Sequence, residues 1–152
     1  MGELRKRLIW SDAAMAVWID IDADTALPEP IKVVELERLL MDGELVCIVD
    51  PFEEAVLREV EEGSLDQQKR DAAWEMLADV AQDPGLFIRK SRGQILIGIM
   101  ERHGVTKQTA YRLLRRYWQR GMCRNALLPD YVNSGALGKR RKPSQAKLGR
   151  PR

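Results

Sequence analysis

The chain has 152 residues, enough for one ordinary domain or two small ones, and its hydrophobic content of 45% is normal for a globular protein. It has no apolar run of about 18 residues, so the sequence predicts no membrane-spanning helix. One histidine and the two cysteines, Cys47 and Cys123, form no recognisable zinc site. Residues 1–85 carry a net charge of −13, whereas residues 86–152 carry +15. This asymmetry predicts nucleic acid as the partner of the C-terminal half.

The N-terminal end of the chain predicts a small α+β unit. Apolar-rich Leu4–Trp10 and Met15–Ile21 are separated by four residues, a spacing that predicts a β-hairpin. A loop follows as far as Pro30, which suits the first turn of a helix that Gly43 ends. The short apolar run Leu45–Val49 then predicts a third strand.

The next region predicts an acidic helical connector. Glu53–Glu62 predicts a short helix ended by Gly63, and Ser64 suits the N-cap of a second helix. One face of that helix carries Trp74, Leu77, Ala78 and Ala81. The negative charge is typical of a solvated face, although it also fits a surface that docks on the basic half when DNA is absent. Nothing in the spacing of its acidic residues repeats a known catalytic pattern.

The basic half predicts two helices joined by a short turn. Ser91–Arg102 forms the first, with Ile95, Ile97, Ile99 and Met100 as its apolar positions. After the turn at 103–105, Thr106 caps a second helix over Lys107–Arg120, which Gly121 ends. Two helices around a glycine-containing turn are the helix-turn-helix signature. In the turn, His103 is either a surface residue or a phosphate contact.

The second helix has the two faces that a recognition helix needs. Its apolar residues Ala110, Leu113, Leu114 and Tyr117 recur at i, i+3, i+4 and i+7, which predicts the packed face. Its other faces carry long donors suited to the major groove. The predicted DNA-binding residues of the helix are Thr106 at its start, Lys107, Gln108, Thr109 and Arg112 for base edges, and Arg115, Arg116 and Arg120 for phosphates. Tyr111 and Trp118 either belong to the core or stack on bases.

After Gly121 the composition predicts an extended basic arm. Its predicted DNA contacts are Lys139, Arg140, Arg141, Lys142, Arg150 and Arg152. The last four residues, Gly-Arg-Pro-Arg, resemble the core of an AT-hook, which lies in the minor groove, but Leu148 departs from that pattern; phosphate tracking is the alternative. The apolar cluster of Leu127, Leu128, Tyr131 and Val132 is expected to pack near the helix pair or near DNA sugar faces.

The sequence therefore predicts an α+β chain: a small β-hairpin/helix unit, then an all-α helix-turn-helix domain and an extended basic arm. The predicted divisions are 1–50 for the α+β unit, 51–85 for the acidic connector, 86–121 for the helix-turn-helix domain and 122–152 for the arm.

The stretch from Val105 to Gly121, followed by Asn125-Ala-Leu-Leu-Pro-Asp-Tyr131 and Asn133-Ser-Gly135, resembles the TnsB-type transposases. These are DDE-type subunits of Tn-seven-like elements and are relatives of the phage Mu transposase. The hairpin and helix before Gly43 and the Gly-Arg-Pro-Arg tail resemble the same family less distinctively.

The resemblance implies sequence-specific binding of double-stranded DNA at transposon-end repeats, by the N-terminal part of a bacterial, cytoplasmic and nucleoid-associated transposase. In the family the Mg²⁺-dependent catalytic domain follows this region, so no catalytic residue, metal ligand or cofactor is expected in this chain. Other transposition proteins are further expected partners, and a membrane is not. The alternative is a free-standing helix-turn-helix transcriptional regulator, which has no need of the motif after Gly121.

Overall fold

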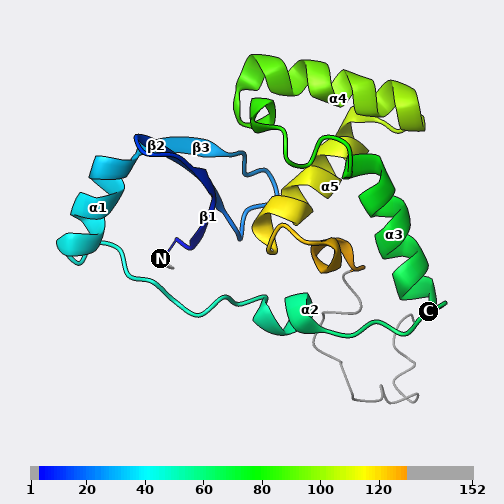
Figure 1. Ribbon diagram of the computed structural model, residues 1–152, viewed down its shortest axis with the longest axis horizontal. Helices are drawn as coiled ribbons and strands as arrows, with labels where there is room; N and C mark the ends of the chain where they lie inside the picture. Colours follow the sequence, from blue (N-terminus) through cyan, green and yellow to red (C-terminus); the bar gives the residue numbers. More distant parts are fainter. Residues whose placement is uncertain (1–3, 130–152) are drawn as a thin grey trace, which may run out of the picture.

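The computed structural model describes residues 4–129, and it has the predicted α+β order of strands followed by helices (Figure 1). The strands are β1 (Lys6–Ser11), β2 (Met15–Asp20) and β3 (Glu29–Lys32). The helices are α1 (Val33–Met41), α2 (Glu53–Leu57), α3 (Leu65–Leu77), α4 (Arg89–His103) and α5 (Lys107–Gln119), with short 3-10 turns η1 (Pro84–Phe87) and η2 (Arg124–Leu127). Within this part of the chain no helix is both long and apolar enough to cross a membrane.

The predicted hairpin is confirmed: β1 and β2 pair in antiparallel register, with Arg7 opposite Ile19. Asp12 stabilises the turn, because its carboxylate accepts hydrogen bonds from the backbone N–H groups of Ala14 and Met15, both at 2.8 Å. The register shifts between Leu8 and Trp10. Such an irregularity bends the strand and changes the direction in which its side chains point.

The third strand is not the one predicted. β3 contains Pro30 and pairs with β2, so Pro30 lies in an edge strand, where proline is tolerated, and not in the first turn of α1. Helix α1 begins at Val33 and, as predicted, Gly43 follows its end, with a φ of +79°. The apolar run Leu45–Val49 forms no strand and lies largely exposed. The choice between the two segments depends on strand pairing across the sheet, which local apolar content does not encode.

Helices α3, α4 and α5 pack together on one side of the molecule, opposite the sheet and α1 (Figure 1). As predicted, Ser64 caps α3 by accepting a hydrogen bond from the backbone N–H of Gln67 at 3.1 Å. The buried residues Leu77 and Ala81 join the core that surrounds α5. The segment predicted as an acidic connector therefore supplies part of the helical core.

Two expected details of the acidic segment were wrong. Helix α2 ends at Leu57 and does not continue to Glu62, because Arg58 has an extended backbone conformation. Helix α3 ends at Leu77, and the next residue, Ala78, is exposed, so it does not belong to the packed face.

The buried face of α4 includes only part of the apolar positions that the sequence shows there. Its buried residues are Arg92, Leu96 and Ile99, whereas Ile97 is 48% exposed. Spacings of three and four residues bring those positions onto one helical face, and alternate positions such as 95, 97 and 99 do not share one. The expected turn is confirmed at Gly104, which ends α4 in the left-handed conformation with a φ of +65°, but His103, predicted in the turn, is the last residue of α4.

The beginning of the predicted arm is folded. Ala126, Leu127 and Leu128 are at most 2% exposed, and η2 packs on α3 and α5. The Asn125 side-chain amide donates hydrogen bonds to the carbonyls of Ala55, Val56 and Arg58. The expected packing of Leu127 and Leu128 near the helix pair is thus confirmed, while Tyr131 and Val132 lie outside the described residues.

Candidate nucleic-acid interface

Helix α5 has the predicted division into a buried and an outer face. Its buried residues are Ala110, Leu113, Leu114, Tyr117 and Trp118, all at most 6% exposed. The Thr106 hydroxyl caps the helix by accepting a hydrogen bond from the backbone N–H of Thr109 at 3.1 Å. Trp118 is therefore a core residue and does not stack on bases. Tyr111 is half-buried at the edge of the core.

Three of the predicted base-reading side chains are exposed at the beginning and middle of α5: Lys107, Gln108 and Arg112. None of them makes a hydrogen bond or ion pair with another residue of the segment 4–129. Thr109 differs, because its hydroxyl oxygen accepts a hydrogen bond from the Thr106 hydroxyl at 3.1 Å. Gln108 and Arg112 thus project from the face opposite the packed stripe, whereas Lys107 lies at the first turn, on the side of α5 that faces α4. All three side chains are available to a ligand.

The three arginines predicted to contact phosphates are held by the fold. Arg115 Nε donates to the carbonyl of Ala26 at 2.7 Å, and burial lowers the pKa of this guanidinium from its usual value. Arg116 Nη1 donates to the carbonyl of Leu128 at 3.3 Å. The Arg120 guanidinium lies over the ring of Phe52, 5.3 Å from its centroid. Their positions are therefore set by contacts within the protein.

The outer face of α5 lines a hollow with a volume of about 380 Å³. The residues that line it are Arg112, Arg115, Arg116, Gln119, Arg120 and Asp24. Arginine guanidiniums dominate this surface, and one carboxylate, from the loop between β2 and β3, lies among them. Such a cluster of donors suits a polyanion better than a small apolar molecule.

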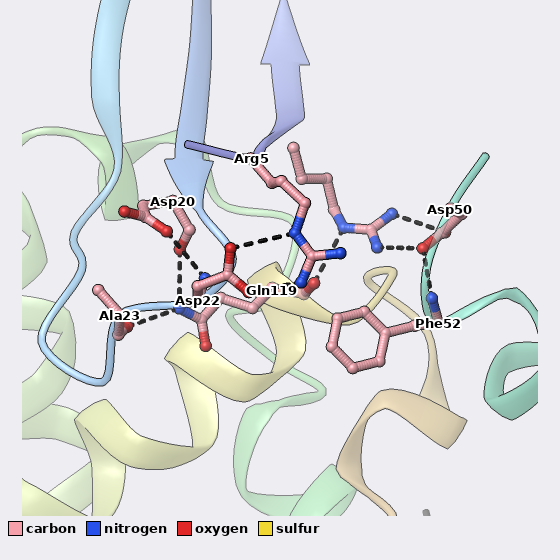
Figure 2. Close-up of polar contacts among 8 residues, drawn as sticks. Arg5, Asp20, Asp22, Ala23, Asp50, Phe52 and Gln119 are labelled. Atoms are coloured by element: carbon pink, nitrogen blue, oxygen red, sulfur yellow. Dashed lines mark hydrogen bonds and ion pairs between the residues drawn. The ribbon is translucent and has the colours of Figure 1, made fainter. Parts of the chain in front are cut away.

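Gln119 fixes the N-terminal sheet to the end of α5. Figure 2 shows its side-chain amide between Asp20 and Ala23, to whose carbonyls Nε2 donates at 2.8 Å each. Its own carbonyl accepts a hydrogen bond from Arg7 Nε at 3.1 Å. Helical periodicity places Gln119 on an outer face of α5, and no local signal identifies its contacts with residues about a hundred positions away.

Arg7 extends the same junction to the start of the acidic segment. Its guanidinium forms a bidentate ion pair with Asp50, at 2.6 and 2.9 Å, and Asp50 also accepts from the backbone N–H of Phe52 at 2.8 Å (Figure 2). The hydrogen bond from Arg7 is the main cause of the lowered pKa of Asp50. The sheet, the acidic segment and α5 therefore meet at one polar cluster.

This lowered pKa predicts an acid-dependent loss of stability. The contribution of Asp50 is fully present above its ordinary pKa of 3.8 and is lost as the pH falls below that value. Asp50→Asn is expected to lower the free energy of unfolding by about 1 kcal/mol at pH 7 and to flatten its decline at acidic pH. Urea titrations between pH 3 and 7 measure this. Glu37→Gln, at an exposed position of α1, serves as the control, and an equal effect of both variants would contradict the assignment.

Comparison with known proteins supports the expectation from the motif in α5. The model of the TnsB N-terminal SH3-like domain matches residues 1–51, and the model of the TnsB second domain matches residues 70–131. The transposon Tn7 transposition protein TnsB of Escherichia coli is 38% identical over 147 residues, which are 96% of this chain and 21% of that relative. The chain contains the two N-terminal domains of the TnsB type. Because it spans about a fifth of that relative, these matches concern the N-terminal TnsB domains only.

The two TnsB matches correspond to the two parts of the structure. The SH3-like match covers the three-stranded sheet, α1 and the segment up to Pro51, and the second-domain match begins within α3 and includes η2. Within residues 4–129 no group of three or more His, Cys, Asp or Glu side chains could hold a metal ion. The predicted contacts of the arm, Lys139, Arg140, Arg141, Lys142, Arg150 and Arg152, lie outside the described residues and stay predictions.

Proposed function

We propose that this TnsB-type region binds double-stranded DNA sequence-specifically at transposon-end repeats, as the N-terminal part of a transposase. The observation that carries the proposal is the outer face of α5. Gln108 and Arg112 project from it, on a helix whose opposite face is buried, and Lys107 is exposed beside it at the first turn. None of the three side chains has an intramolecular partner in the described part of the chain.

The chemistry of these side chains supports distinct roles in DNA recognition. Arg112 suits bidentate hydrogen bonding to guanine O6 and N7, and Gln108 suits adenine N6 and N7. Lys107 lies at the start of the helix, the part that usually contacts base edges in this motif. Arg115, Arg116 and Arg120, which the fold orients, suit the flanking phosphates, and the basic arm beyond the described residues adds further phosphate contacts.

We assign binding and no reaction chemistry to this chain. In the proposed function, Mg²⁺-dependent strand transfer belongs to the catalytic domain of the family, together with contacts to other transposition proteins. The proposed binding takes place on DNA of the bacterial nucleoid, in the cytoplasm.

Binding of the whole chain to labelled duplexes tests the proposal. We expect a transposon-end duplex to bind more tightly than a shuffled duplex of equal composition, and affinity for both to fall steeply with salt because phosphate contacts release counterions. Fluorescence anisotropy at several salt concentrations measures both effects. The whole chain is used and not the basic half alone, because α3, which lies in the acidic half, belongs to the helical core. Equal affinity for both duplexes, or affinity independent of salt, would contradict the proposal.

A further inference from the structure

A second basic hollow lies between α4 and α5, on the side of α5 that faces α4. It has a volume of about 700 Å³. Three cations line it, Arg89, Arg92 and Lys107, together with Gly93, Gln94, Tyr111 and the apolar residues Leu27, Leu96, Ile97 and Met100. We infer that this hollow, named here the α4–α5 groove, binds the sugar-phosphate backbone of one DNA strand, with Arg89, Arg92 and Lys107 as its cationic ligands. The inference rests on the proposed DNA-binding function and specifies a contact that the sequence did not predict.

Arg92 is the strongest reason for this inference. It is only 5% exposed, yet its guanidinium contacts only neutral groups in the described part of the chain: Nη1 donates to the carbonyl of Leu86 at 3.1 Å, and Nε lies 3.4 Å from the hydroxyl of Tyr111. No carboxylate of residues 4–129 forms an ion pair with it. Buried charges are normally paired, because removing a charge from water is costly. An anion in the groove would supply the missing partner.

The first turn of α4 indicates the same ligand. Its N-cap, Ile88, provides no side-chain hydrogen bond, and no acidic residue follows in that turn. Arg89 and Lys90 occupy it instead and oppose the helix dipole, since cations are unfavourable near an N-terminus. Helices α3 and α5, in contrast, have hydroxyl caps at Ser64 and Thr106. A phosphate bound in the groove would pair with Arg89 and with the unsatisfied N–H groups of the turn.

The place of the groove fits the geometry of DNA docking. Lys107 lines it and is also the first residue of α5, so the groove adjoins the base-reading surface. In helix-turn-helix proteins the second helix enters the major groove while the first helix crosses the flanking backbone. A strand that borders the major groove at the start of α5 would therefore pass along α4.

Single methylphosphonate substitutions in a transposon-end duplex test the inference, because each removes the charge of one phosphate. We expect neutralisation of one or two adjacent phosphates to weaken binding of the unmodified chain about tenfold. In Arg89→Ala the same substitutions should have much smaller effects, because the interacting charge is already absent. Lys90→Ala is the matched control, since Lys90 is a neighbouring exposed cation that does not line the groove. Identical phosphate profiles for the unmodified chain and Arg89→Ala would overturn the inference.

Gly93→Leu provides a second test that changes no charge. A Cβ atom at Gly93 meets no atom within 4 Å, so the variant should fold, and its side chain should obstruct the groove. We expect affinity for the end duplex to fall about tenfold or more while the thermal transition is retained. Unchanged affinity in a folded Gly93→Leu chain would exclude the groove as the contact. If the unmodified chain prefers end DNA but neither variant shows the expected effect, this inference fails and the proposed function stands. If the unmodified chain shows no preference, the proposed function itself fails.

Discussion

Trp118→Ala is expected to lower the free energy of unfolding by about 3–5 kcal/mol, because it removes a large side chain from a core that cannot fully collapse around the cavity. Trp118 is 0% exposed. The centroid of its ring lies 6.1 Å from the ring centroid of Phe87. The ring centroid of Phe87 in turn lies 6.3 Å from that of Trp10 in the sheet. The substitution therefore affects both the helical core and its junction with the N-terminal unit. Urea denaturation followed by far-UV circular dichroism measures the loss.

Trp118→Phe provides the control for this stability prediction. The indole Nε1 is buried and makes no hydrogen bond with any residue from 4 to 129, so phenylalanine loses ring volume but no hydrogen bond. We expect this variant to keep most of the stability that Trp118→Ala loses. A loss below about 1 kcal/mol for Trp118→Ala would contradict the central position of this ring, since such a value is typical of surface substitutions.

Arg112→Ala is expected to weaken binding to the transposon-end duplex by about 1–3 kcal/mol, roughly 5- to 150-fold, and to weaken binding to unrelated duplexes much less. The physical reason is the loss of a bidentate base contact, which matters only where the matching base is present. Because Arg112 is exposed and has no partner in the described part of the chain, the fold should not change. Equilibrium binding to both duplexes, together with a thermal melt, measures these expectations.

Lys32→Ala is the matched control for Arg112→Ala, since it removes one exposed positive charge at the N-cap of α1. Figure 1 shows that α1 lies away from α5. Lys32→Ala should reduce affinity for both duplexes only slightly and equally. Selection of preferred sites from a random library gives an independent measurement. If Arg112→Ala selects the same site as the unmodified chain, with the same discrimination at every position, Arg112 does not read a base.

Local sequence signals determined much of the helical region that carries the proposed interface. The apolar spacing of Ala110, Leu113, Leu114 and Tyr117 predicted the packed face of α5, and the hydroxyl of Thr106 predicted its start. Both signals act within about one or two helical turns, so they do not depend on the rest of the fold. The same is true of the cap at Ser64. The charge asymmetry likewise predicted the class of partner, because net charge needs no coordinates.

Tertiary structure decided which of the polar residues on α5 remain available. By periodicity Arg112, Arg115 and Gln119 all belong to outer faces, but Arg115 and Gln119 donate to carbonyls at the end of β2 and in the segment that joins β2 to β3. Only Arg112 among these three lacks a partner in the described part of the chain. The distinction depends on where the N-terminal sheet docks, which is a relation between distant segments and leaves no periodic trace in α5.

The sequence by itself thus determined the helix pair, the caps at Ser64 and Thr106 and the packed stripe of α5, and it predicted a polyanionic partner, because each depends on neighbouring residues or on total charge. The structure alone decided that Glu29–Lys32 and not Leu45–Val49 completes the sheet, that η2 belongs to the helical core, and that Arg92 is buried without an ionic partner among the described residues. Those features depend on contacts between segments as far apart as Arg7 and Gln119, which are separated by 112 positions. Such contacts become definite only when the competing pairings and packings of the whole chain are resolved together.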